Sequence, residues 1–536
     1  MLNAFGLLPI LLFFTFSSIH GQTFQKKFTS GYPRSFAVAA IEAETGSYMV
    51  IGEREYDSLY STGSLLIKLD KFGLLLGSQL ITRLDKSDSF EPRCMIRTFD
   101  EGYAITGVIS GDTSKDFCIL KINRDNKIEW NNVIGTPELP DEPRSIIQTS
   151  DSGFIIAGYA TPVFDLDPGI LGLVVKLDKT GSMVWSYSIS GFRTDFLAIT
   201  ETSDSGIVFC GSMLDSSNTT SSTITKLDKN GILSWRKVIG IPSRNDEAFD
   251  ITSTVDGGFA VCGVVENSTD NCYISKCDAE GKVLWSKIID AFGQEMPVSI
   301  VERKDSSLVL AGRMSFKSPW GGTDSLFVAS LTASGELKYF RMSTQQYSLS
   351  ANSITKTLDN GFIVTGFAEN KYSGASIFVS KFDSNGSNCN MRDLLVSTNQ
   401  GIREIAMGFP VSSGSIYQSK AFFAIEPITI SESDLCDQTY VAHSQSQIPN
   451  VSLFPNPVAS TQTLTVVIPS NLASGRYLLS IHDALGKEVY HEKKNLSGAE
   501  ESITIQIETL PAGIYTVELL DANTFTAVYH GKIVKL

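Results

Sequence analysis

Four carboxylates that share one position of an internal repeat are the residues of this chain best placed to do chemistry. They stand sixteen residues before the closing glycine of consecutive repeats: Glu91, Glu142, Asp195 and Glu247. If these residues begin the innermost strands, they form a partial ring at one mouth of an axis. There they could bind a cation or a sugar, or shift one another's pKa. In the structural alternative, which we favour, each acid caps its own loop or pairs with Arg93, Arg144 or Arg244.

Histidine is missing where an active site would be expected. None of the five histidines lies between residues 22 and 390: they are His20, His443, His482, His491 and His530. This excludes histidine-activated nucleophiles and histidine-ligated metals from that region. The chain also has no Walker A loop, dinucleotide-binding glycine motif, GxSxG elbow or HExxH helix. We therefore predict no catalytic residue, no metal and no cofactor. The alternative is a carbohydrate-active hydrolase or lyase that uses the four acids.

A repeat that occurs seven times between residues 45 and 366 must position these acids. Each copy is an apolar run that ends in glycine, most often after an Asp-x-Gly turn: TGSYMVIG, DEGYAITG, DSGFIIAG, DSGIVFCG, DGGFAVCG, DSSLVLAG and DNGFIVTG. The turn pairs are typical of tight hairpins, and the apolar runs of buried strands. A period of about 50 residues with strand-like content indicates a β-propeller in which each repeat is one blade.

A second phrase completes each repeat and ends in an Asp-x-x-Gly turn, as in VKLDKTG (175–181). A large aromatic residue stands four residues after this turn in five repeats, where we expect it to pack between adjacent sheets: Trp130, Trp185, Trp235, Trp285 and Tyr339. The position thirteen residues before each closing glycine is nearly always small, as expected where strands converge on a narrow axis: Ala39, Cys94, Ser145, Ala198, Asp250, Ser299 and Ser353.

The last repeat lacks its outer strand, and the start of the chain supplies a replacement. TFQKKFTSG (23–31) resembles WSYSISG (185–191), which is the outer strand of another repeat, without its tryptophan. We predict that residues 23–30 close the ring as the outer strand of the seventh blade. Closure removes the exposed sheet edges that would otherwise invite aggregation.

Composition and the N-terminus predict an exported protein. The chain has 536 residues, 42% hydrophobic and 19% charged, with a net charge of −14. The negative charge argues against nucleic acid and anionic membranes as partners. Residues 1–21 hold an apolar stretch from Phe5 to Phe16 that is short for a membrane span, and they predict a signal peptide cut near Gly21. No other segment is apolar enough to cross a bilayer.

The eight cysteines are unevenly placed for an exported chain. Cys210 and Cys262 lie inside apolar strands, where a free thiol behaves as a small apolar side chain. Cys389 and Cys436 bracket a stretch outside the repeats. They are the candidate disulfide.

From residue 450 the sequence changes, and four motifs follow in order: FPNP (454–457), YLLSIHDALGKEV (477–489), LPAGIYTV (510–517) and KIVK (532–535). In this order they resemble the type A C-terminal sorting domain of the type IX secretion system. The resemblance implies a small antiparallel Ig-like β-sandwich and a Bacteroidetes source. It also implies export to the outer cell surface or the medium, with the type IX translocon and its sortase as partners.

Two short motifs resemble the O-glycosylation acceptors of the same bacteria. They are Asp57-Ser58-Leu59 and Asp324-Ser325-Leu326, and we expect both to lie in loops between strands, with Ser58 and Ser325 as acceptors.

The sequence therefore predicts an all-β chain: a seven-bladed β-propeller followed by a small antiparallel Ig-like β-sandwich. The expected boundaries are a signal peptide (1–21), the propeller (22–390), a linker or strap (391–449) and the sorting domain (450–536). The favoured function is a secreted or cell-surface binding or scaffold protein without catalysis. Its ligand, a polysaccharide or a surface protein, stays open.

Overall fold

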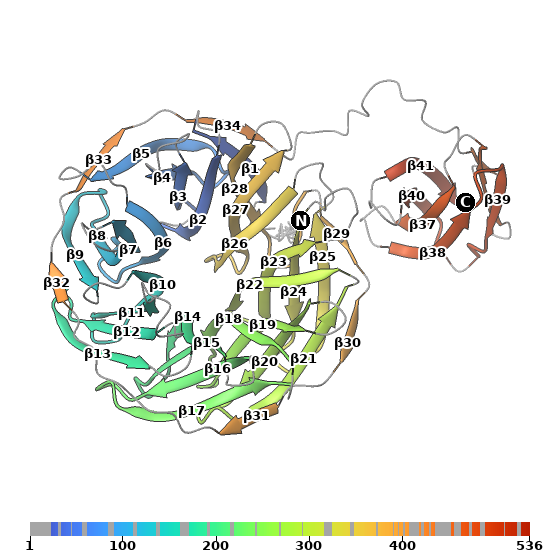
Figure 1. Cartoon of the computed structure of the whole chain (residues 1–536). Helices are drawn as coiled ribbons and strands as arrows, with labels where there is room; N and C mark the ends of the chain where they lie inside the picture. The colour runs from blue at the N-terminus through green and yellow to red at the C-terminus, as the bar shows by residue number, and fades with distance from the viewer. Residues whose placement is uncertain are drawn as a thin grey trace, which may run out of the picture.

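The computed structural model is all-β, and every regular element in the part that it describes is a strand (Figure 1). The described residues are 23–30, 34–43, 46–55, 62–83, 90–110, 115–135, 140–160, 171–189, 193–214, 219–241, 244–266, 270–291, 293–315, 324–343, 348–370, 374–389, 391–394, 396–399, 403–406, 417–419, 423–427, 430–434, 452–454, 463–470, 474–482, 488–508, 510–521 and 527–535. The predicted signal peptide lies outside them.

Residues 34–382 form small antiparallel sheets, each built from consecutive strands. The strands are β2 (Arg34–Glu42), β3 (Tyr48–Glu55), β4 (Thr62–Leu69) and β5 (Leu75–Arg83); β6 (Phe90–Arg97), β7 (Tyr103–Ser110), β8 (Lys115–Ile122) and β9 (Ile128–Gly135); β10 (Asp141–Gln148), β11 (Phe154–Ala160), β12 (Leu171–Leu177) and β13 (Met183–Ile189); β14 (Arg193–Glu201), β15 (Ile207–Leu214), β16 (Thr220–Leu227) and β17 (Leu233–Gly240); β18 (Asp246–Ser253), β19 (Phe259–Glu266), β20 (Asp270–Cys277) and β21 (Val283–Asp290); β22 (Gln294–Glu302), β23 (Leu308–Ser315), β24 (Asp324–Leu331) and β25 (Leu337–Ser343); and β26 (Ser348–Lys356), β27 (Phe362–Asn370) and β28 (Gly374–Phe382).

The sheets stand around a common centre (Figure 1). The first strand of each sheet contacts the first strand of the next, from β2 through β6, β10, β14, β18 and β22 to β26, and β26 contacts β2 again. The second strands, which hold the apolar runs of the repeat, are buried between neighbouring sheets; Ile156, Val261 and Val364, for example, are inaccessible to solvent. Burial on both faces explains why these runs are continuously apolar rather than alternating.

The N-terminal strand completes the last sheet. β1 (Phe24–Thr29) pairs antiparallel with β28, with Phe24 opposite Lys381 and Phe28 opposite Ile377. Phe24 and Phe28 are both buried. A single parallel bridge between Arg34 and Ala375 also joins the first sheet to the last. The N-terminal strand therefore lies where closure of the ring requires it.

Six short strands between residues 391 and 434 lie at the outside of the ring and are here called the belt (Figure 1). Its strands are β29 (Met391–Asp393), β30 (Ser397–Asn399), β31 (Arg403–Ala406), β32 (Tyr417–Ser419), β33 (Phe423–Pro427) and β34 (Ser431–Asp434). In chain order they pair antiparallel with β25, β21, β17, β9, β5 and β1. The belt covers the edge groups that outer strands otherwise expose.

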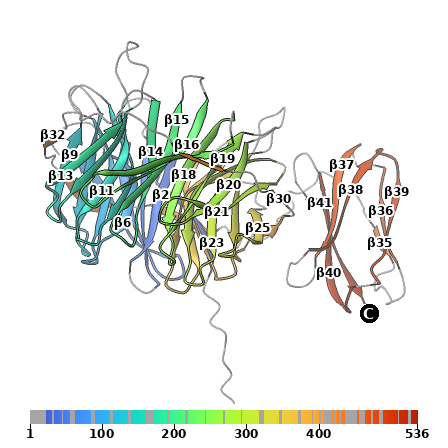
Figure 2. The same ribbon diagram turned by 90° about the horizontal axis from the view of Figure 1, so that it is seen from below.

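Two kinds of hairpin turn lie at the same end of every sheet, because the four strands alternate in direction. The inner turn joins the first strand to the second, and the outer turn joins the third to the fourth. The residue after the aspartate of the inner turn adopts a positive φ, as at Ser152 (67°) and Asn360 (65°). The ring therefore has one face, here called the turn face, made of short and nearly identical turns (Figure 2 shows the ring from the side).

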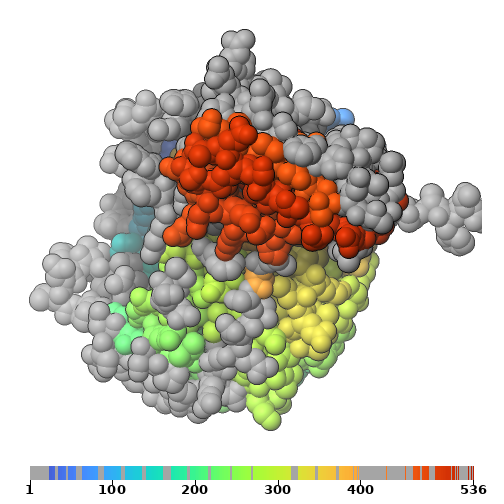
Figure 3. All heavy atoms as spheres, turned by 90° about the vertical axis from the view of Figure 1, so that its right-hand side faces the viewer, coloured from blue at the N-terminus to red at the C-terminus, as the bar shows by residue number. Residues whose placement is uncertain are grey.

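The C-terminal strands form a unit of their own (Figures 1 and 3). One sheet contains β35 (Ser452–Phe454), β36 (Leu464–Ile468) and β39 (Glu501–Ile505). The other contains β37 (Gly475–His482), β38 (Glu488–Leu496), β40 (Gly513–Asp521) and β41 (Ala527–Lys535). Both sheets contribute to one apolar core, in which Val466, Leu479 and Ile533 are inaccessible to solvent.

Candidate ligand-binding site

A buried lysine–aspartate pair ties the inner turn to the third strand in five sheets. The lysine side chains are at most 9% exposed, and Nζ lies 2.6–2.9 Å from the carboxylate: Lys121–Asp100, Lys176–Asp151, Lys226–Asp204, Lys276–Asp256 and Lys381–Asp359. Burial raises the pKa of Asp151, but hydrogen bonds from Lys176 and Thr149 outweigh it and lower the pKa to about 2. These pairs hold the turn face rigid.

In every sheet of the ring except β2–β5, an aromatic residue packs against the outer turn of the next sheet. A Cβ atom added to Gly181 would lie 2.7 Å from the Trp130 ring, and one added to Gly231 would lie 2.7 Å from the Trp185 ring. The other aromatic–glycine pairs are Trp235–Gly281, Trp285–Gly335, Tyr339–Gly386 and, from β1, Phe24–Gly73. Gly231 also has a φ of +82°. The rings thus fill the junctions between sheets beside the turn face.

The turn face carries every large apolar side chain that is exposed in the described part of the chain. Each lies in a turn or in the first two residues of the strand that follows an outer turn: Phe72, Leu74, Leu76, Phe99, Met183, Val184, Ile232, Leu233, Val255, Leu284 and Leu358. Val255 is 81% exposed and Phe99 65%. Exposed apolar groups gathered on one face mark an interaction surface more often than scattered ones do.

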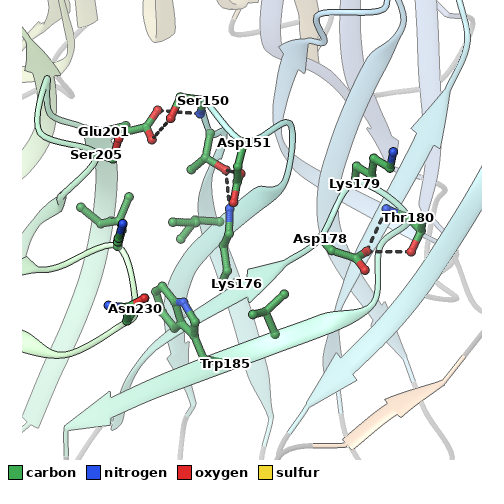
Figure 4. Close-up of a pocket in the computed structure, with 15 residues that line it drawn as sticks. Ser150, Asp151, Lys176, Asp178, Lys179, Thr180, Trp185, Glu201, Ser205 and Asn230 are labelled. Carbon is green, nitrogen blue, oxygen red and sulfur yellow. Dashed lines mark hydrogen bonds and ion pairs between the residues drawn. The ribbon is translucent and has the colours of Figure 1, made fainter.

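A groove of about 690 Å³ opens at the turn face between the β10–β13 sheet and the β14–β17 sheet (Figure 4). Its apolar lining comes from Ile155 of β11, Val184 and Trp185 of β13, and Ile207 of β15. The outer turns of the two sheets contribute Asp178 and Asn230. Its volume lies within the range of small-molecule sites.

Most polar groups of this groove are already engaged with one another. Ser150 donates from its backbone N (2.9 Å) and its hydroxyl (2.8 Å) to the two carboxylate oxygens of Glu201, across the junction. Asp178 Oδ1 accepts from the backbone N of Thr180 and of Ser182 at 2.8 and 2.9 Å. Figure 4 shows Trp185 between Asn230 and the Asp178 turn, below the Lys176–Asp151 pair. The groove is therefore already formed without a ligand: most of its polar groups bind one another, and one indole ring lines it.

The four carboxylates predicted from the sequence lie near the start of the innermost strands, and two of them pair with arginines. Glu91 Oε2 accepts from Arg93 Nη2 at 2.8 Å. Glu142 Oε2 lies 3.2 Å from Arg144 Nη2 and accepts a hydrogen bond from the Tyr159 hydroxyl. These contacts match the structural alternative. Arginine pairing leaves little free carboxylate for substrate chemistry.

The other two predicted acids are closer to each other. Asp195 Oδ1 accepts from the backbone N and the hydroxyl of Ser212 at 2.8 and 2.6 Å. Burial raises the pKa of Glu247, and the negative charges of Asp195 and Asp270 raise it further. Burial raises the pKa of Asp246 to about 7, although a hydrogen bond from Ile241 N and the positive charge of Arg244, the third arginine of the structural alternative, act to lower it.

Two further acids with raised pKa values, Glu53 and Asp250, were not among the predicted site residues. Burial raises the pKa of Glu53 to about 7 against the nearby Arg93, 3.6 Å away. Asp250, at the axis position, accepts from the Ser299 hydroxyl and from Ile300 N, both at 2.7 Å. Burial nevertheless raises its pKa to about 6. Among the described residues, no group of three or more histidine, cysteine or acidic side chains could hold a metal.

Cysteines and candidate acceptors complete the list of predicted sites. Cys210 and Cys262 are buried free thiols, and Cys389 is disulfide-bonded. Its predicted partner, Cys436, lies outside the described residues, as does Ser58. Ser325 corrects an expectation: it lies inside β24, opposite Met314 of β23, and not in a loop. The Asp-Ser-Leu motif continues directly into the apolar strand, so β24 begins at Asp324.

Comparison with known families identifies the C-terminal unit. Residues 452–535 match the family described as a secretion system C-terminal sorting domain. The protein is therefore exported by the type IX secretion system to the cell surface or the medium. Within the described residues, no helix is long and apolar enough to span a bilayer.

Several solved structures resemble the chain at low identity. No curated protein matches it. A Dyadobacter fermentans protein of unknown function has 13% identity and a TM-score of 0.39, and the match covers 56% of this chain and 97% of that one. A putative glycoside hydrolase from Parabacteroides distasonis has 10% identity and a TM-score of 0.23 over 66% and 86% of the two chains. A Bombyx mori β-fructofuranosidase has 9% identity and a TM-score of 0.22 over 73% and 92%. Likenesses this low carry no inference about function.

Proposed function

We propose that residues 22–390 are a closed seven-bladed propeller, that 391–449 strap it, and that 450–536 are an Ig-like sorting domain handled by the translocon and sortase. The repeated four-strand pattern supports the blade number. Five sheets are separate, and the first and last sheets are linked in the ring only by the Arg34–Ala375 bridge.

We propose further that the propeller is a binding protein that uses its turn face and does no catalysis. The observation that carries this proposal is the gathering of exposed apolar side chains on that face, in the described part of the chain. The face is held by the buried lysine–aspartate pairs, so the binding surface is formed before the ligand arrives. A preformed surface loses little conformational entropy on binding.

The alternative is a carbohydrate-active enzyme at the channel mouth. It is favoured by the raised pKa of Glu247 beside Asp195, because a carboxyl group that stays protonated can act as a general acid. The pairing of Glu91 and Glu142 with arginines favours the binding protein instead.

The test is adsorption of the full chain, without its signal peptide, to cellulose, xylan, chitin and mucin. The variant F99D/V255D/L358D places three charges on exposed turn tips. We expect it to lose at least ten-fold in adsorption with an unchanged melting temperature. The control S502D/T504D/Q506D adds the same charge at exposed positions of the sorting domain.

The outcomes distinguish the non-catalytic binding protein from the carbohydrate-active enzyme. Loss of adsorption in the turn-face variant alone, with no soluble sugar released from the polymers, supports a non-catalytic binding face. Equal adsorption of both variants, or no adsorption of the parent protein, contradicts it. Release of soluble sugars that stops in E247Q supports the enzyme.

A further inference from the structure

The junction at Trp185 differs from its neighbours in one residue. The first residue of the second strand meets the tryptophan of the preceding sheet. Trp130 meets Phe154 with ring centroids 5.6 Å apart, and Trp235 meets Phe259 at 6.2 Å. At Trp185 the equivalent residue is Ile207. This junction, which holds the groove, therefore lacks the aromatic ring of its two neighbours. Trp285 also meets an aliphatic residue, Leu308, which belongs to the same apolar cluster.

Only part of the Trp185 indole is covered by the protein. Its fused rings lie against Gly231 of the next outer turn, as the other tryptophans lie against their glycines. The side chain is half-buried, as are those of the other three repeat tryptophans, and it lines the groove together with Val184. An indole face carries negative electrostatic potential, which attracts the C–H groups on the faces of a sugar ring.

The charges around the groove balance. The lining contains three carboxylates and three lysines: Asp151, Asp178, Glu201, Lys176, Lys179 and Lys229. Lys176 is paired with Asp151 at 2.7 Å, and Glu201 accepts two hydrogen bonds from Ser150. A balanced lining offers no net attraction to an ion. It does offer carboxylate, amide and hydroxyl groups to a ligand rich in hydroxyls.

We propose that this groove is a subsite for a neutral oligosaccharide, with one sugar ring against Trp185. The proposal rests on the proposed binding function and names its ligand class. Asn230 and Asp178, from the two flanking outer turns, lie on either side of the indole and can hydrogen-bond sugar hydroxyls (Figure 4). Ile207 keeps the groove open for the sugar by being smaller than phenylalanine.

The chain itself suggests the deciding variant. Ile207→Phe introduces the side chain that two neighbouring junctions already accommodate, so it should fill the groove without unfolding the ring. Ile207→Leu conserves volume and is the matched control. Trp185→Ala removes the stacking surface. Trp235→Phe is a control at a different junction, where the partner ring, Phe259, is present.

The experiment is calorimetric titration of the full chain, without signal peptide, with soluble hexasaccharides of glucose, xylose and mannose, and with an oligogalacturonate. We expect the parent and Ile207→Leu to bind at least one neutral hexasaccharide. Binding should weaken at least ten-fold in Ile207→Phe and in Trp185→Ala, and not in Trp235→Phe. Melting temperatures of Ile207→Phe and the parent should agree within a few degrees.

Several results would overturn the proposal. Unchanged affinity in a folded Ile207→Phe protein places the ligand elsewhere. Preference for the oligogalacturonate contradicts the neutral ligand class, and no binding of any neutral sugar by the parent contradicts the subsite. The proposed binding function of the turn face is tested separately by F99D/V255D/L358D. It is supported if this variant loses adsorption to the polymers, and contradicted if adsorption is unchanged.

Discussion

The buried lysine–aspartate pairs predict an unequal cost for removing the two partners, and the β18–β21 sheet offers the clearest case. Lys276 is 5% exposed, whereas the Asp256 side chain is 56% exposed. Lys276 Nζ donates to Asp256 Oδ1 at 2.7 Å and to the Thr254 hydroxyl at 2.6 Å. In Asp256→Asn the ammonium group stays buried with only neutral acceptors. In Lys276→Met the carboxylate stays in water and still accepts from Thr254 and Gly258 N.

The magnitudes follow from burial. Breaking a fully buried ion pair by removing one partner costs about 3–5 kcal/mol, and the exposure of Asp256 reduces this to about 2 kcal/mol for Asp256→Asn. Lys276→Met replaces a buried charge by an apolar side chain of similar length, so we expect about 0–1 kcal/mol. The double variant should resemble Lys276→Met.

The assay is chemical denaturation of the four proteins, followed by tryptophan fluorescence at neutral pH. The reasoning is refuted if Lys276→Met is destabilised as much as Asp256→Asn. The pH dependence gives a second readout. Burial raises the pKa of Asp256, but the hydrogen bonds from Lys276 and Thr254 outweigh it and lower the pKa. The pair therefore stabilises the fold above the unfolded pKa of about 3.9, and this contribution is lost as pH falls through the lower folded value. Asp256→Asn should flatten that acid loss.

Three further predictions follow from the ring, the turn and the belt. Deleting residues 22–31 removes β1 and exposes the edges of β28 and β34, so the melting temperature should fall; an unchanged value contradicts closure by β1. Gly231→Ala should destabilise by at least about 1–2 kcal/mol in denaturation, because φ is +82° and the new Cβ meets Trp185, and a neutral result would show that the turn can relax. Cys436→Ser should expose one thiol at Cys389 to alkylation and lower the melting temperature, since a bridge that closes a long loop stabilises by up to about 4 kcal/mol; an unreactive Cys389 would assign its bond to another partner.

What the sequence predicted well is what the repeat determines. The positions of Trp130, Trp185, Trp235 and Trp285 follow from a fixed distance to a turn glycine, and each packs where that distance places it. Positive φ in the inner turns, as at Ser152, follows from the Asp-Ser pair. The conformation of a tight turn can be predicted from the sequence because it depends on residues that are adjacent in the chain.

Contacts between side chains on different strands could not be predicted from the sequence in this way. The Lys276–Asp256 pair depends on a side chain that reaches from the third strand to the inner turn, although lysine two residues before the outer-turn aspartate recurs and could have indicated it. The hydrogen bonding of Glu142 depends on Tyr159, which lies opposite it on β11. The belt has strands of three to five residues with no repeat, and their partners are outer strands far away in sequence. The groove lies beside Ile207 and Trp185, which are on different sheets, and their proximity is visible only in the folded ring.

The most direct test is a crystal structure of the full chain, without its signal peptide, soaked with the hexasaccharide that binds best. We expect seven sheets in the ring and sugar density in the groove between β13 and β15, with one ring against Trp185. Sugar density at the channel mouth beside Glu247 and Asp195, with the groove empty, would contradict the account.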